Sequence, residues 1–96
     1  MIYVCVRWIN AIPSEPVLIY SEIDSDNFEL RKVEVYADGL MGFSDGTNSD
    51  GETMLSTGPL PSLQEIAADP QFVPVGITQE EFEMMWSAAL LLSRHC

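Results

Sequence analysis

The chain has 96 residues, of which 47% are hydrophobic, and its 15 acidic and 4 basic side chains give a net charge of −11. This length accommodates one compact domain, and the hydrophobic content is sufficient for a core. So acidic a chain argues against direct binding to DNA, RNA or an anionic membrane, because contacts to phosphates need clustered lysine and arginine. We therefore expect a single domain, residues 1–96, whose acidity either attracts a partner that carries positive charge or serves solubility alone.

The cysteines and the start of the chain indicate a reducing compartment. Cys5 and Cys96 are too few for a disulfide framework, and their spacing fits no metal site. Residues 1–7 lack the basic region and small-residue cleavage site of a secretory signal. The longest uninterrupted apolar run, 88–92, is far shorter than the roughly 20 residues that cross a membrane. We expect a cytoplasmic protein without a membrane segment.

The first half of the chain predicts four strands joined by tight turns. Asp38-Gly39 is a hairpin signal in which both central residues favour positive φ. In the third strand the apolar residues change parity, which favours a bulge around Arg31 and Lys32. Short connections favour an antiparallel meander. The predicted strands are 2–9, 17–23, 28–37 and 40–43.

The second half predicts a long connector and two helices. Residues 44–61 are rich in glycine, proline and polar side chains, and a connector this long favours a mobile loop. Two capping boxes follow, Ser62 with Glu65 and Thr78 with Glu81, each of which starts a helix. Pro70 ends the first helix. The predicted fold is therefore α+β: a four-stranded antiparallel sheet followed by two C-terminal helices packed on one face.

Metal binding and catalysis lack the residues they need. The acidic residues between 24 and 52 do not match a calcium loop, because Gly46 would occupy the first ligand position and Thr57 the last. The single histidine, His95, is next to last, and the glycines fit no phosphate-binding loop. Paired carboxylates for acid–base chemistry occur in any acidic protein. We expect no metal, no cofactor and no enzymatic activity.

The last helix has apolar residues on two sides. At 100° per residue, Phe82, Met85, Trp86 and Ala89 form one stripe, which we assign to the core. Met84, Ala88 and Leu91 form a second stripe on roughly the opposite side. This second stripe is either buried under the long loop or the first strand, or it contacts a partner or a second copy in a homodimer.

The net charge is larger than the magnitude of roughly 2–8 that suits a small domain, and such a field accelerates association with a basic partner. We interpret the basic residues Arg31 and Lys32 as forming ion pairs with neighbouring carboxylates on the sheet. The alternative is that they bind an acidic group on a partner. The predicted contact residues are Glu22, Asp24, Asp26, Asp45, Asp50 and Glu52, with anchors from Tyr20, Tyr36 or Trp8.

Several segments occur together: Trp8, 15–22, 31–36, 37–39, 62–70 with Phe72, 77–78, 81–83 and Trp86. In this combination they resemble a family of short, acidic, uncharacterised bacterial proteins, a domain of unknown function. The resemblance covers nearly the whole chain and implies no catalytic residues. It implies a loose association with genes for toxins and their immunity proteins.

Charge and resemblance together predict an acidic binding protein that neutralises a basic partner, as an immunity protein does against a toxin such as a nuclease. The alternative is an inhibitor that mimics nucleic acid and blocks a complex that handles DNA or RNA. A third hypothesis is a small enzyme or ligand-binding domain that uses the open sheet face. A convergent pocket with buried carboxylates would favour that third hypothesis.

Overall fold

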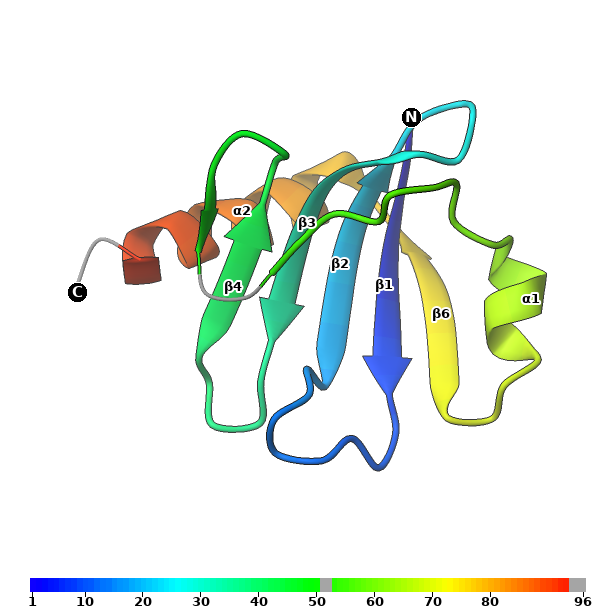
Figure 1. Cartoon of the computed structure of the whole chain (residues 1–96), viewed down its shortest axis with the longest axis horizontal. Helices are drawn as coiled ribbons and strands as arrows, with labels where there is room; N and C mark the ends of the chain where they lie inside the picture. The colour runs from blue at the N-terminus through cyan, green and yellow to red at the C-terminus, as the bar shows by residue number, and fades with distance from the viewer. Residues whose placement is uncertain (51–52, 94–96) are drawn as a thin grey trace.

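The computed structural model describes residues 1–50 and 53–93, and it is an antiparallel sheet with a helix across one face (Figure 1). The strand order is β5-β4-β3-β2-β1-β6, and each neighbouring pair is antiparallel. In chain order the elements are β1 (Ile2–Trp8), β2 (Leu18–Ile23), β3 (Glu29–Val35), β4 (Met41–Ser44), β5 (Ser49–Asp50), α1 (Leu63–Ala67), β6 (Phe72–Ile77) and α2 (Gln79–Ser93).

The predicted α+β class and the meander of the first four strands are confirmed, but the number of strands is wrong. The two-residue β5 extends the sheet beyond β4, and the full strand β6 pairs with β1 at the other edge. Ile9 N–H donates to Gln71 O at 2.7 Å, so these two residues form a hydrogen-bonded pair. Such pairs alternate with non-hydrogen-bonded pairs along antiparallel strands, so Val6 and Pro74 form a non-hydrogen-bonded pair and the Pro74 nitrogen faces the open edge of the sheet. Proline is tolerated at such an edge because no neighbour needs its missing N–H.

In the middle of the sheet the predicted bulge in the third strand is confirmed next to Arg31, while the predicted turn at Asp38-Gly39 needs correction. The irregularity lies at Leu30, because Ile23 pairs with Glu29 while Glu22 pairs with Arg31. This bulge turns Glu29 and Arg31 toward opposite faces of the sheet. The hairpin between β3 and β4 has a three-residue loop, 37–39, in which Gly39 N–H donates to Tyr36 O at 2.9 Å. Gly39 has a positive φ and Asp38 does not.

α2 covers one face of the sheet and forms the main core with it. Val33 and Phe43 of the sheet and Ala89 of the helix are buried together, and Trp86 packs edge-on against Phe43 with ring centroids 5.3 Å apart. Phe82, on the side of α2 that faces the sheet, is fully buried. The Thr78 hydroxyl accepts Glu81 N–H at 3.1 Å, which confirms the capping box at the start of α2.

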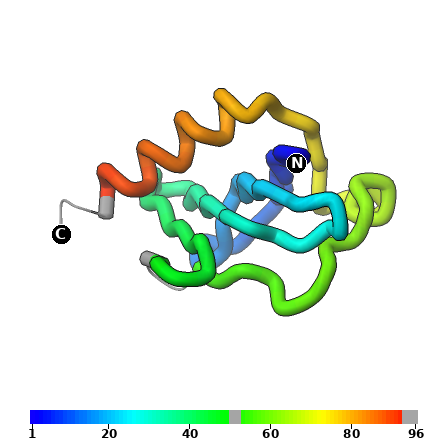
Figure 2. The backbone as a smooth tube through the Cα atoms, turned by 90° about the horizontal axis from the view of Figure 1, so that it is seen from above, coloured from blue at the N-terminus to red at the C-terminus, as the bar shows by residue number. Residues whose placement is uncertain are grey.

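The two helices lie over different faces, so their predicted packing on one face is wrong. Residues 53–62 cross the face opposite α2, and α1 lies beside β6, as Figure 2 shows from above. After β5 the chain crosses the sheet to the free edge of β1, where it forms β6. α2 then follows β6 and lies across the other face. The capping box of α1, Ser62 with Glu65, is confirmed.

The described part of the long connector is held to the sheet by hydrogen bonds. Thr53 is buried and donates from its hydroxyl to Glu34 at 2.7 Å, and Leu60 N–H donates to Asn27 O at 2.8 Å. Its predicted mobility stays a prediction, since 51–52 lie outside the described residues. Within the described chain, no helix is long and apolar enough to cross a bilayer.

Candidate functional site

Arg31 binds two carboxylates, one on the sheet and one on α2. Its guanidinium donates to Glu22 at 2.7 and 2.8 Å, and to Glu83 at 3.0 and 2.7 Å. The Tyr3 hydroxyl donates to Glu22 at 2.9 Å. Glu22 is buried, so its carboxylate needs these partners to offset the loss of water.

The electrostatics of this cluster follow from its geometry. Hydrogen bonds from Arg31 hold the pKa of Glu22 and of Glu83 below the usual range, and the same bonds raise the pKa of Arg31. The guanidinium carbon also lies 4.9 Å from the ring centroid of Phe82 and 5.1 Å from that of Trp86. Arg31 therefore fastens α2 to the sheet.

Lys32 is neutralised in a second cluster on the opposite face. Its ammonium lies 3.2 Å from Glu29 Oε1 and donates to Met54 O at 2.9 Å. The Glu29 carboxylate also accepts Ser21 Oγ–H at 2.7 Å and Ser56 N–H at 3.0 Å. The interpretation of Arg31-Lys32 as a pair neutralised within the sheet is confirmed for both residues.

These two clusters decide the charge of the surface. Two of the four basic residues are neutralised by buried carboxylates, and within 1–50 and 53–93 Arg7 is the only exposed basic side chain. The exposed carboxylates of the described chain are Asp26, Asp38, Glu65, Asp69, Glu80 and Glu81. The surface formed by the described residues is therefore more uniformly negative than their composition alone requires.

The topology gathers several carboxylates at one end of the sheet. Because neighbouring strands are antiparallel, β2, β4 and β6 all end at this end, the upper one in Figure 1. We call the side chains that follow these three strands the acidic end. The amino group of Met1 lies there as well (Figure 1). The acidic end comprises Asp24, Asp26, Asp45, Glu80 and Glu81.

The members of the acidic end differ in what they already bind. Asp24 accepts the N–H groups of Asp26 and Phe28, and Asp45 accepts those of Thr47 and Asn48, so both shape their own turns. The bonds from the Asn48 and Thr47 backbones lower the pKa of Asp45. The Asp26 side chain is exposed and shapes no turn in this way.

Four other predicted contact residues, Glu22, Tyr20, Trp8 and Tyr36, do not belong to the acidic end. Glu22 lies inside the fold in the Arg31 cluster, where a partner does not reach it. Tyr20 is half-buried against the core, and burial raises its pKa to about 12. Trp8 packs on Phe72 with ring centroids 5.2 Å apart. Tyr36 is half-buried, while the Asp50 side chain and Glu52 lie outside the described residues.

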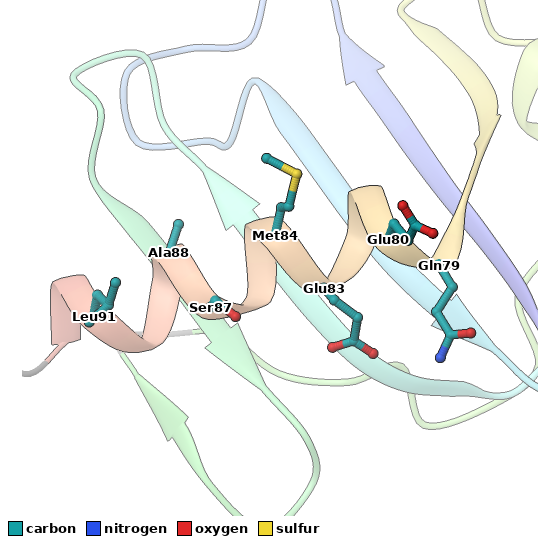
Figure 3. A pocket seen from close by; sticks show the side chains of 7 residues that line it. All are labelled: Gln79, Glu80, Glu83, Met84, Ser87, Ala88 and Leu91. Carbon is teal, nitrogen blue, oxygen red and sulfur yellow. The ribbon is translucent and has the colours of Figure 1, made fainter.

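The second stripe of α2 is exposed and lines a shallow hollow of about 630 Å³ (Figure 3). Met84 is 72% and Leu91 58% exposed, with Ala88 between them, so neither β1 nor the described part of the long connector covers the stripe. Figure 3 shows Glu80 at the start of the same stretch of helix. We call this surface, made by Glu80, Met84, Ala88 and Leu91, the α2 face.

Sequence reasoning missed Glu83 as the partner of Arg31. The two residues are 52 positions apart, and no local pattern relates a residue of β3 to one of α2. Within the described residues, no group of three or more histidine, cysteine, aspartate or glutamate side chains is placed to hold a metal ion.

Comparison with known proteins identifies a family but no function. The family model described as Domain of unknown function (DUF6881) matches residues 2–91. No curated protein and no solved structure matches the chain. The expected resemblance to a domain of unknown function is confirmed, while its association with toxins and immunity proteins stays a prediction.

Proposed function

The chain belongs to the DUF6881 family of domains of unknown function, and from its own surface we propose that it is a non-enzymatic, acidic module that binds and neutralises a basic protein. The observation that carries this proposal is the internal neutralisation of Arg31 and Lys32. The five carboxylates of the acidic end then face neither Arg31 nor Lys32, and the amino group of Met1 is the positive charge that Figure 1 places beside them. Such a surface steers a basic partner and raises its association rate.

The α2 face supports the same proposal, because it adds apolar contacts to the charge. α2 begins at the acidic end, and Glu80 belongs to both surfaces. A partner segment with basic residues at one end and apolar residues beyond them complements this arrangement. Apolar anchors supply most of the affinity of such contacts, and the surrounding charges supply rate and specificity.

The finer form of the proposal is a cytoplasmic immunity protein that shields a bacterial toxin, such as a nuclease. Its alternative is an inhibitor that mimics nucleic acid and occupies the site of a protein that handles DNA or RNA. Both forms use the same charges and differ in the target. A homodimer through Met84, Ala88 and Leu91 would compete for the same surface, and charge repulsion between two copies of net charge −11 opposes it.

The experiment is capture with the tagged protein from a lysate of its source organism, at low salt and at about 1 M salt, where the screening length falls to about 3 Å. We expect a basic protein to be retained at low salt and released at high salt. The double variant Asp26→Lys/Glu80→Lys should lose it. The matched control Asp38→Lys/Asp69→Lys makes the same change of charge at the other end of the sheet and should retain it.

Identification of the captured protein, followed by competition, separates the two forms. Duplex DNA or RNA that displaces the chain from the captured protein would support mimicry, and displacement by neither would support neutralisation of a toxin. Equal loss in both double variants would show a nonspecific effect of net charge. That result, or retention that does not respond to salt, would reject the acidic end as the contact surface.

A further inference from the structure

A second cavity lies on the face of the sheet opposite α2, between the sheet, α1 and the segment 60–61. Its volume is about 400 Å³, within the range of roughly 300–1,000 Å³ that small-molecule sites occupy. Val6 and Ile19 of the sheet form part of its floor, and Leu60, Ile66 and Phe72 form apolar walls. The acidic end and the α2 face contribute no residue to it.

A smaller and more enclosed hollow adjoins this cavity. It has a volume of about 50 Å³ and shares Val6, Ser21, Leu60, Pro61 and Ile66 with its larger neighbour. α1 has five residues, none of them buried, so this helix does not fill the space above the sheet. An apolar space that the protein's own side chains leave open favours occupation by an apolar group from outside.

The charges that line the cavity favour a cation. At its base, Glu29 and Lys32 neutralise each other, and Glu29 is further bound by Ser21 and Ser56. Glu65 and Asp69 line the cavity and are exposed, so they lie at its opening. Glu65 binds Ser62 through Oε1, and Asp69 binds Gln71 N–H through Oδ1. The structure shows no hydrogen bond to Glu65 Oε2 or Asp69 Oδ2 from a described residue.

We propose that this cavity binds a small organic cation, an ammonium group on an aromatic or branched aliphatic body. The body fills the space between Val6, Ile19 and Ile66, and the ammonium group donates hydrogen bonds to Glu65 and Asp69 at the opening. An anion of the same shape is repelled by these carboxylates. A neutral isostere keeps the apolar contacts but loses the charge-assisted hydrogen bonds. The site is separate from the surface proposed for the basic partner and does not depend on it.

The test is a titration of the isotope-labelled protein, followed by backbone amide chemical shifts, with three probes of one shape. The probes are phenethylamine, 2-phenylethanol and 3-phenylpropionate. We expect saturable shifts from phenethylamine in α1, in 60–61 and in the cavity-facing residues of β1 and β2. The alcohol should bind about tenfold more weakly, in line with the loss of a hydrogen bond to a charged group. The propionate should give no saturable shifts.

A variant pair separates the site from general attraction to an acidic protein. Glu65→Gln/Asp69→Asn removes the charges at the opening, and glutamine still serves the capping box. Glu80→Gln/Glu81→Gln makes the same change of charge and keeps the second capping box. Phenethylamine affinity should fall about tenfold in the first variant and stay unchanged in the second.

Four outcomes would overturn the proposal. They are the absence of saturable shifts, equal affinity for the amine and the alcohol, shifts spread over the acidic end, and equal weakening in both variants. Since neither variant changes a buried side chain, loss of folding does not complicate the comparison.

Discussion

Arg31 of β3 and Glu83 of α2, which are 52 positions apart, are joined by two hydrogen bonds of 3.0 and 2.7 Å. The same guanidinium binds the buried Glu22 and lies over the rings of Phe82 and Trp86. One side chain therefore connects the sheet to the helix through both charge and aromatic contacts. The position of the α2 face and of Glu80 depends on this connection.

Replacing Arg31 should destabilise the fold strongly. In Arg31→Met the buried Glu22 carboxylate loses its hydrogen bonds from the guanidinium and keeps the one from the Tyr3 hydroxyl. A buried charge without its partner costs about 3 kcal/mol, so the free energy of unfolding should fall by that amount in urea denaturation. Glu83→Gln is the control. The Glu83 side chain is 42% exposed, and its loss should cost less than about 1 kcal/mol. Equal effects would contradict the assignment.

The Arg31 cluster should also make stability depend on acidic pH. Folding lowers the pKa of Glu22 and Glu83, mainly through hydrogen bonds from Arg31. The contribution of these two carboxylates to the free energy of unfolding is therefore complete above the pKa of about 4.3 that glutamate has in the unfolded chain. This contribution is lost as the pH falls through their lower pKa values in the folded protein. Denaturation midpoints measured from pH 7 to about pH 3 should decline less steeply in Glu22→Gln/Glu83→Gln. An unchanged slope would assign the acid sensitivity to other carboxylates.

The β3–β4 hairpin should require glycine at position 39. Gly39 has a φ of +90°, where an added Cβ is strained even though it would meet no atom within 4 Å. Gly39→Ala should lower the free energy of unfolding by about 1 kcal/mol. Gly58→Ala is the control, because Gly58 has no positive φ and equally open surroundings. It should change stability by less than about 0.5 kcal/mol. Thermal melts of the two variants make the comparison.

The two stripes of α2 should respond oppositely to substitution. Met84→Glu and Leu91→Glu change exposed residues and should leave the thermal melt nearly unchanged. Phe82→Ala empties a fully buried site and should cost about 3–5 kcal/mol. Sedimentation of wild type and both glutamate variants then tests for a homodimer. A dimer in the wild type that the variants lose would assign the α2 face to self-association instead of a basic partner.

The elements that could be predicted from the sequence are those specified by short-range patterns. Short apolar segments and the turn signal at Asp38-Gly39 predicted β1 to β4, and two capping boxes predicted the starts of both helices. β6 was missed because Pro74 and Gly76 interrupt its apolar run. That strand forms by pairing with β1, about 70 positions earlier in the chain.

The candidate surfaces were predicted in part. The second apolar stripe of α2 followed from helical periodicity, while its exposure is known only from the structure, and the acidity of the chain followed from composition. The acidic end could not be predicted without the strand order, because the antiparallel sheet alone places the residues after β2, β4 and β6 together. Glu22 was misjudged as a contact residue, since its burial depends on α2 lying over its strand.

By itself the sequence determined the net negative charge, which is a sum over residue types. It also determined the helix starts and the first four strands, because hydrogen bonds and side-chain periodicity within a few residues specify these elements. Only the tertiary structure decided which charges remain on the surface. The bulge at Leu30 sends Glu29 and Arg31 to opposite faces, where each meets partners from distant segments. Burial then makes those ion pairs obligatory, because a charge removed from water needs an opposite charge or donor within hydrogen-bond distance.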